Sequence, residues 1–280
     1  MKTLVTGGSG YLGTYVRNFF SADDFSRRSG LDILDPEAVK TIADYDAVIH
    51  LAAHFDKSPE GAEECFRTNA EGTANVIRNV KPGAAFIYAS TKDVYGSNAN
   101  DLEYVPESTS TEYCGQSAFE WSKLIGEQYV EYFARQQDVR ACIFRLSTVF
   151  ARPSEGNEPG IVTHYVESIK HRQPIRLPPQ IDPVRDILYV DDFSRACQSF
   201  INSDRKFGLY NLGGGRINTV SLRGLIARVG NQIEIEPVIE EDPRIPAPVP
   251  LRYVSDTSRV TDDLGWQLQI GVDDAMRVLL

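Results

Sequence analysis

The chain has 280 residues, of which 42% are hydrophobic, enough for one large domain or two smaller ones with a packed core. Its formal net charge of −10 leaves no basic surface of the kind that binds nucleic acid. No apolar run is long enough to cross a membrane, and the four cysteines show no metal-binding spacing. We therefore expect a cytoplasmic protein with no nucleic-acid, membrane or metal partner.

The first half of the chain alternates short apolar runs with helical patterns, which is typical of βαβ units. Such units form a parallel sheet that helices cover on both faces. We therefore predict an α/β fold whose larger part is a doubly wound parallel sheet of the Rossmann type. The predicted strands are 2–6, 24–27, 46–51, 84–90 and 139–146, and the predicted helices are 11–20, 60–80 and 117–135.

A glycine-rich segment, TGGSGYLG, follows the first strand and opens the first helix. Its G-x-x-G-x-x-G spacing suits a tight turn whose backbone approaches a pyrophosphate. Amides at the start of the helix add unpaired donors and a partial positive charge. Because strand, turn and helix occur in the order that this motif requires, we predict a dinucleotide site that includes Gly7, Gly10, Tyr11, Leu12 and Gly13.

The second predicted strand ends in Arg27 and Arg28. An acidic residue there would bind the ribose 2′-hydroxyl of NAD, whereas guanidinium groups suit the 2′-phosphate of NADP. A solvated basic loop explains the same charges equally well. The sequence therefore predicts NAD or NADP with a slight preference for NADP, and it makes Asp32 a candidate for contact with the adenine.

After about residue 150 the regular alternation weakens and prolines cluster. A strand at 186–190, a helix at 191–202 and a strand near 210–212 are still predicted. We expect a dinucleotide-binding domain at 1–150, joined by about 186–212. The rest of the chain, 151–185 and 213–280, is expected to form a smaller α/β region that binds the substrate.

Several segments in a fixed order make the chain resemble the extended short-chain dehydrogenase/reductase family. Within that family it is most similar to nucleotide-sugar epimerases, dehydratases and 4-keto-sugar reductases. The resemblance covers nearly the whole chain and does not single out one reaction or one sugar. Besides the glycine-rich turn, it rests on HLAA (50–53), FIYASTKDVYG (86–96), SKLIGE (122–127), RDILYVDD (185–192), YNLGGGRINTVSL (210–222) and YVSDTSRVTDDLGW (253–266).

The resemblance implies roles for individual residues. Thr91 matches the catalytic Ser/Thr of the family, and Lys123 matches the lysine that holds the nicotinamide ribose. Members commonly form homodimers through helices that correspond to 59–79 and 111–136, so we expect a homodimer. The resemblance also implies adenine or dinucleotide contacts at Asp32, Ile33, Leu51, Ala52 and Ala53, and contacts with a nucleotide-sugar substrate at Thr148, Arg185 and Arg252.

One position departs from the family's pattern. The family places a tyrosine four residues before the lysine, on the same helical face, and this chain has Phe119 before Lys123. A phenyl ring has no proton to exchange, so the usual general base is missing. Such a loss costs about 10²–10⁴-fold in rate. The standard mechanism of the family is therefore in question, whereas dinucleotide binding is not.

Three explanations for Phe119 remain open. Another group supplies the proton, and Tyr113 is the first choice because it precedes the helix in the same segment. Alternatively, Lys123 acts through water and Thr91. As a third explanation, catalysis is lost and the chain is a non-catalytic NAD(P)-binding regulatory or scaffold subunit. The other candidate proton carriers are Asp93, Tyr95, Cys114 and Glu120.

Overall fold

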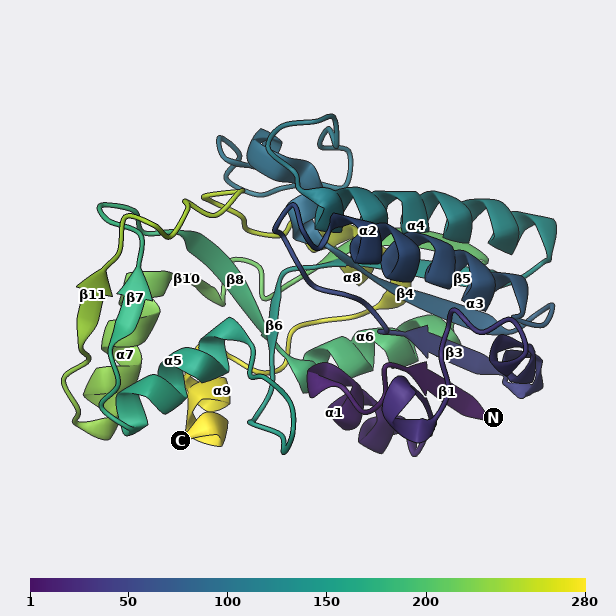
Figure 1. The fold of residues 1–280 in the computed structure, drawn as a ribbon, viewed down its shortest axis with the longest axis horizontal. Coiled ribbons are helices and arrows are strands. Elements are labelled where there is room, and N and C mark those ends of the chain that lie inside the picture. The colour runs from purple at the N-terminus through teal and green to yellow at the C-terminus, as the bar shows by residue number, and fades with distance from the viewer.

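The computed structural model describes all 280 residues and shows a larger and a smaller α/β part (Figure 1). The apolar runs of the first half form a six-stranded sheet in which all neighbours are parallel, in the order β2-β1-β3-β4-β5-β9. This confirms the predicted parallel sheet. Its strands are β1 (Thr3–Thr6), β2 (Asp23–Phe25), β3 (Ala47–His50), β4 (Ala85–Thr91), β5 (Arg140–Leu146) and β9 (Phe207–Leu212).

Helices cover both faces of this sheet because successive side chains of each strand point to opposite sides. Leu4 packs in the same apolar cluster as Val130 of the long helix, whereas Val5 packs with Phe193 on the other face. Figure 1 shows these two layers above and below the sheet. One layer contains α2 (Ala62–Cys65), the π-helix η3 (Phe66–Gly72), α3 (Thr73–Arg78) and α4 (Ala118–Gln136), and the other contains α1 (Tyr11–Phe20) and α6 (Val190–Asn202).

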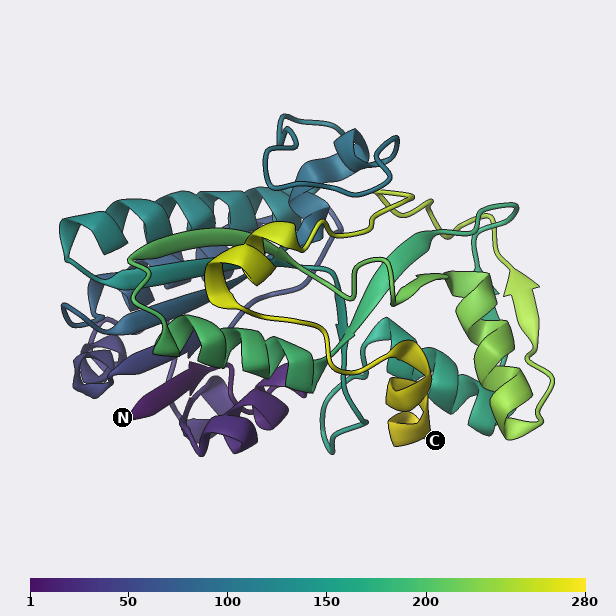
Figure 2. The ribbon, with the colours of Figure 1, turned by 180° about the vertical axis from the view of Figure 1, so that it is seen from behind.

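The smaller part lies beyond the carboxyl ends of the parallel strands (Figure 2). It contains a three-stranded sheet in the order β10-β8-β6 and a pair formed by β11 and β7. The last part of the chain first returns to the large sheet, where α8 packs near β9. The bounds are β6 (Thr148–Phe150), α5 (Ile161–Lys170), β7 (Ile175–Leu177), β8 (Val184–Tyr189), β10 (Thr219–Ser221), α7 (Leu222–Ile233), β11 (Ile239–Glu241), α8 (Ser258–Leu264) and α9 (Val272–Leu279).

Two predicted segments differ in detail from the structure. The second strand ends at Phe25 instead of Arg27, because Ser26 caps a short 3₁₀ turn, η1 (Arg27–Ser29). The amide of Ser26 donates to the hydroxyl of Ser29 at 3.0 Å, which turns the chain away from the sheet. The strand expected at 186–190 is β8, which pairs with β6 and β10 and not with the large sheet. The division into two domains stays a prediction.

The order of the strands defines where a ligand can enter. From β1 the chain continues to β2 on one side and later to β3 on the other, so a crevice opens at the carboxyl ends of these strands. The turn after β1, the segment after β3 and Thr91 at the end of β4 all lie at this edge. No helix in the structure is long and apolar enough to cross a membrane.

Candidate active site

The turn after β1 is built so closely that it requires glycine. Gly7 has φ of +69°, and a Cβ there would lie 2.8 Å from the backbone nitrogen of Ala52. A Cβ on Gly13 would collide with the carbonyl oxygen of Gly7. Gly10 is the N-cap of α1 and offers no side-chain cap, so the first amides of the helix keep free donors. This geometry suits a pyrophosphate.

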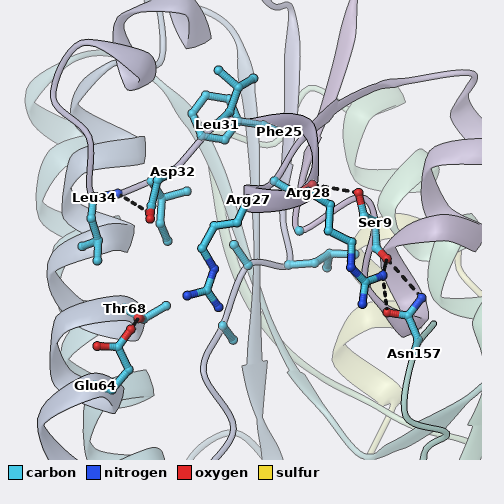
Figure 3. A pocket seen from close by; sticks show the side chains of 17 residues that line it. Ser9, Phe25, Arg27, Arg28, Leu31, Asp32, Leu34, Glu64, Thr68 and Asn157 are labelled. Carbon is cyan, nitrogen blue, oxygen red and sulfur yellow. Dashed lines mark hydrogen bonds between the residues drawn. The ribbon is translucent and has the colours of Figure 1, made fainter.

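A cavity of about 250 Å³ opens beside this turn (Figure 3). Most of the residues that the sequence predicts to contact the dinucleotide line this cavity. The sequence reasoning missed Asn157, which reaches the cavity from the smaller part and donates to the carbonyl of Ser9 at 3.1 Å. The predicted residues in the lining are Gly7, Gly10, Arg27, Asp32, Ile33, Leu51, Ala52 and Ala53, and the others missed are Ser9, Phe25, Ser26, Leu31, Leu34, Glu64 and Thr68.

The two arginines after β2 have different surroundings. Arg28 donates to the carbonyl of Ser9 and the side-chain oxygen of Asn157, both at 2.9 Å, and to the carbonyl of Gly156 at 2.6 Å. The guanidinium of Arg27 makes no hydrogen bond or ion pair, and it extends into the cavity (Figure 3). Arg27 therefore presents an uncompensated positive charge to a ligand, whereas Arg28 is already engaged.

Four predicted dinucleotide residues lie outside the lining of this cavity. Tyr11 has a structural contact, because its hydroxyl donates to the carbonyl of Ala151 at 2.7 Å and accepts from the amide of that residue at 2.8 Å. Leu12 packs against the core, and Gly13 allows α1 to approach the turn. The fourth, Lys123, lies deeper, on α4.

Thr91 and Lys123, which we predict to be catalytic residues, lie on β4 and α4. Thr91 ends β4, and its hydroxyl accepts from the amide of Asp93 at 3.2 Å. Lys123 is only 4% exposed, and its amine takes part in none of the hydrogen bonds or ion pairs of the chain. The amine lies 4.5 Å from the ring centre of Tyr88. Burial lowers the pKa of Lys123 to about 7, although Glu127 opposes the shift.

An amine buried without a partner is costly, and the hydroxyls of a ribose would satisfy it. Together with the glycine turn and the free guanidinium of Arg27, Lys123 makes the site fit a nicotinamide dinucleotide. When bound, that cofactor supplies or accepts a hydride.

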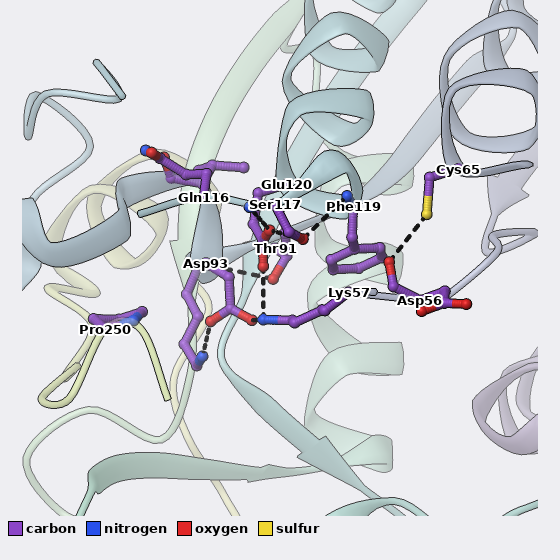
Figure 4. Close-up of polar contacts among 12 residues, drawn as sticks. Asp56, Lys57, Cys65, Thr91, Asp93, Gln116, Ser117, Phe119, Glu120 and Pro250 are labelled. Atoms are coloured by element: carbon purple, nitrogen blue, oxygen red, sulfur yellow. Dashed lines mark hydrogen bonds and ion pairs between the residues drawn. The ribbon is translucent and has the colours of Figure 1, made fainter. Parts of the chain in front are cut away.

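Beside Phe119 lies a cluster of charges that the sequence did not predict (Figure 4). The amine of Lys57 lies 2.7 Å from a carboxylate oxygen of Asp93 and 2.6 Å from one of Glu120. Lys92 binds the other carboxylate oxygen of Asp93. Burial disfavours the charge on Lys57, but Asp93 and Glu120 outweigh it and raise the pKa of Lys57. The two carboxylates considered as bases are therefore partners of one ammonium group.

The remaining candidates to replace the tyrosine have other environments. Tyr113 is 70% exposed, and its hydroxyl makes no hydrogen bond. Tyr95 is buried, and its hydroxyl donates to the side-chain oxygen of Asn211 at 2.7 Å. Burial raises the pKa of Tyr95 to about 12, which makes it a poor base near neutral pH. The thiol of Cys114 contacts the hydroxyl of Ser97.

A second cavity, of about 220 Å³, lies in the smaller part. Thr148 and Arg185 line it, as predicted for substrate contacts, whereas Arg252 does not line it and donates to the carbonyl of Glu103 at 3.3 Å. Arg185 is 6% exposed, and it donates only to backbone carbonyls, for example to Pro250 at 2.7 Å. With no carboxylate bound, its positive charge remains available for an anion.

The sequence model of the NAD-dependent epimerase/dehydratase family matches residues 3–213, three quarters of the chain. The chain belongs to this family. Its curated relatives include nucleotide-sugar epimerases, dehydratases and reductases, which are enzymes. The predicted resemblance is thereby confirmed.

Two relatives and one solved structure illustrate the likeness. The chain is 28% identical to dTDP-glucose 4,6-dehydratase of Mycobacterium tuberculosis, over 95% of this chain and 88% of that protein. It is 24% identical to CDP-paratose 2-epimerase of Salmonella typhi, over 99% of this chain and 97% of that protein. The structure of RMD from Pseudomonas aeruginosa complexed with NADPH has a TM-score of 0.83 at 21% identity, over 100% of this chain and 98% of that one. This last likeness shows the fold.

Proposed function

We propose that this protein is an enzyme that uses a nicotinamide dinucleotide to convert a nucleotide-linked sugar, by epimerisation, dehydration or ketone reduction. The observation that carries the proposal is the buried, unpartnered amine of Lys123 on the helix that packs against β4, the strand that Thr91 ends. The ring of Tyr88 contacts this amine but accepts no conventional hydrogen bond from it, and the hydroxyls of a ribose would satisfy its donors.

In this proposal each group has one task. Lys123 holds the nicotinamide ribose, and Thr91 donates a hydrogen bond to the oxygen at the reacting carbon of the sugar. Arg185 and Thr148, in the second cavity, bind the nucleotide diphosphate. Arg252, outside that cavity, stays a candidate substrate contact.

NADP is the preferred dinucleotide in this proposal. The free guanidinium of Arg27 faces the cavity at the end of β2, where the adenosine ribose is expected. A 2′-phosphate would receive a charge-assisted hydrogen bond from it. NAD offers a hydroxyl at that point, which leaves the charge uncompensated.

The test is to supply the protein with NADPH or NADH and with UDP-, dTDP-, CDP- and GDP-linked sugars, both hydroxy and keto forms. NMR then identifies any product. Turnover of at least one nucleotide-linked sugar is expected. If the protein binds the dinucleotide but neither binds nor converts any of these sugars, the proposed enzyme activity is wrong.

Phe119 favours a second candidate function, a non-catalytic dinucleotide-binding subunit that regulates or supports a partner. In that case the native protein binds NADP and turns over no sugar, and Phe119→Tyr creates an activity that the native protein lacks. Turnover by the native protein excludes this candidate.

We further propose a homodimer formed through the layer of α2, η3, α3 and α4. Aromatic side chains on this layer are exposed, among them Phe66, Trp121 and Tyr132. Such side chains are enriched in interfaces. Light scattering should give twice the mass of one chain, and a mass near one chain would refute the dimer.

A further inference from the structure

We propose that Lys57 is the proton donor that takes the place of the family's tyrosine, and that the site therefore works as a ketone reductase. The inference rests on the proposed function. Its basis is the geometry around Phe119, where the amine of Lys57 lies over the ring and is held by two carboxylates.

The position of this amine is fixed by contacts from two elements. Asp93 follows β4 in the segment of Thr91, and Glu120 follows Phe119 in the first turn of α4. Both carboxylates hold the amine at hydrogen-bond distance, and the amine lies 5.9 Å from the ring centre of Phe119. Figure 4 shows Lys57 running alongside that ring. The amine lies equally far, 5.9 Å, from the ring centre of Phe55. The proton that we assign to Lys57 is therefore held over the two rings that occupy the expected place of the tyrosine.

Glu120 is itself anchored, so the cluster is rigid. Its second carboxylate oxygen accepts from the amide of Ser117 at 2.6 Å, which closes a capping box at the start of α4. Glu120 is only 2% exposed. Lys57, by contrast, keeps 39% of its side chain exposed, so it can regain a proton from water.

The charge state of this cluster near neutral pH favours one direction of the reaction. Two carboxylates around one amine keep it as an ammonium, which can give a proton and cannot take one. At an ordinary lysine pKa of about 10.4, fewer than about one amine in a thousand is neutral at pH 7. Oxidation of a sugar hydroxyl needs a base, whereas reduction of a sugar ketone needs an acid. The cluster therefore fits reduction.

The carbon–oxygen π bond of the keto sugar breaks as a hydride from the reduced dinucleotide joins the carbon, so the sugar is reduced and the dinucleotide is oxidised. The oxygen takes a proton from the amine of Lys57. The neutral amine then takes a proton from water, and the cluster returns to its starting charge.

A second lysine, Lys92, is the alternative donor within the same cluster. Its amine binds the opposite oxygen of Asp93 and lies 5.8 Å from the ring centre of Tyr253. Lys57, Asp93 and Arg185 are the charged groups around it. Single substitutions can distinguish the contributions of the two lysines, because each amine contacts a different carboxylate oxygen of Asp93.

The experiment uses full-length protein with NADPH and nucleotide-linked 4-keto sugars, and it follows consumption of the reduced dinucleotide. The key variant is Lys57→Arg, which keeps a positive charge and both ion pairs but does not release a proton. We expect its kcat to fall about 10²–10⁴-fold with unchanged affinity for NADP. The kcat of Lys57→Met should fall as far. Adding Phe119→Tyr to Lys57→Met should raise kcat again by at least tenfold. Lys40→Met, an exposed lysine on the far 3₁₀ segment η2 (Ala38–Asp44), serves as the unchanged control.

A readout without turnover uses ¹⁵N-lysine protein bound to oxidised NADP. Adding the keto sugar should shift the ammonium resonance of Lys57, which is assigned by its loss in Lys57→Arg. The role of Lys57 would be overturned by a native rate of reduction in Lys57→Arg or by the absence of a shift of that resonance. It would also be overturned if Lys92→Met or Tyr113→Phe lost reduction while Lys57→Arg kept it. If the native protein binds NADP and converts no nucleotide-linked sugar, the proposed function itself fails.

Discussion

The ring of Phe119 meets the ring of Phe55 edge to face, with 4.7 Å between the two ring centroids. Phe119 is 6% exposed because the largely exposed ring of Phe55 covers it. The position at which we predict the family's tyrosine is therefore occupied by two packed apolar rings. The ammonium group of Lys57 lies over the ring of Phe119, 5.9 Å from its centre.

Removing this cover should destabilise the protein slightly. An edge-to-face aromatic pair is worth about 0.5–1.5 kcal/mol beyond the area that it buries. We expect Phe55→Ala to lower the free energy of unfolding by at least this much, as measured by urea denaturation. Its affinity for NADP should remain native, since Phe55 does not line the dinucleotide cavity. A variant that loses NADP binding would show that this pair of rings also shapes the cofactor site.

Arg27 should determine the choice of dinucleotide. A hydrogen bond to a charged group contributes about 1.5–3 kcal/mol, so Arg27→Ala should weaken NADP binding about 10- to 100-fold. Binding of NAD should change little, because NAD carries no phosphate at that point. Calorimetric titration measures both affinities. The matched control is Arg277→Ala, an exposed arginine on α9. Equal losses for the two dinucleotides would contradict the role given to Arg27.

Lys123 should make stability depend on pH in a defined direction. Its pKa is lowered to about 7 in the folded protein, whereas the unfolded chain keeps a value of about 10.4. Between these values the unfolded state binds the extra proton, so the free energy of unfolding rises with pH, by up to about 1.4 kcal/mol per pH unit. Below about pH 7 the protein carries the full cost of the buried charge.

The variant Lys123→Met should be more stable than the native protein at pH 7, and the difference should shrink toward pH 10. Burial lowers the pKa of Lys92 to about 8, but Lys92 is present in both proteins and so does not affect this comparison. Urea denaturation of both proteins at several pH values measures the difference in their free energies of unfolding. A difference that does not change with pH would show that the amine of Lys123 titrates normally.

Gly13→Ala should disrupt the turn. Its new methyl group would collide with the carbonyl of Gly7, and overpacking of this kind costs about 1–3 kcal/mol. We expect a lower melting temperature and loss of NADP binding. The control is Gly271→Ala, where the nearest atom to the added Cβ lies 3.9 Å away. Native NADP binding by Gly13→Ala would mean that the turn does not hold the pyrophosphate.

Arg185 should affect the substrate and not the cofactor. Arg185→Met removes the charge that faces the second cavity, so KM for the nucleotide-linked sugar should rise about tenfold or more. Affinity for NADP should stay native. Arg244→Met, an exposed arginine paired with Asp242, is the control. An unchanged KM would place the diphosphate elsewhere.

The sequence predicted the large sheet and the dinucleotide turn well because both follow from local patterns. Apolar runs, helical periodicity and the glycine spacing lie within short stretches of chain. The position of Lys57 could not be predicted in this way. It meets Asp93 and Glu120 only because the segments after β3 and β4 and the start of α4 come together at one edge of the sheet.

Similar charges in sequence also differed in their surroundings. Arg27 and Arg28 are neighbours, yet only the structure shows that Arg28 is held by Ser9 and by Asn157 from the smaller part. The second strand was predicted too long because its end is set by the cap that Ser26 forms. This cap is a local hydrogen-bond pattern that a polar stretch of sequence does not reveal. The strand, helix and strand predicted between 186 and 212 correspond to β8, α6 and β9, whereas α5, α7 and α9 were missed because short strands and proline-rich loops interrupt the periodicity of this region.

The last strand of the large sheet, β9, comes from residues 207–212, after the chain has already crossed into the smaller part. During synthesis the edge of β5 therefore remains unpaired until more than two thirds of the chain has left the ribosome. Pairings this distant in sequence form slowly. The two parts consequently mature together, and a fragment ending near residue 150 would expose a bare apolar strand that favours aggregation.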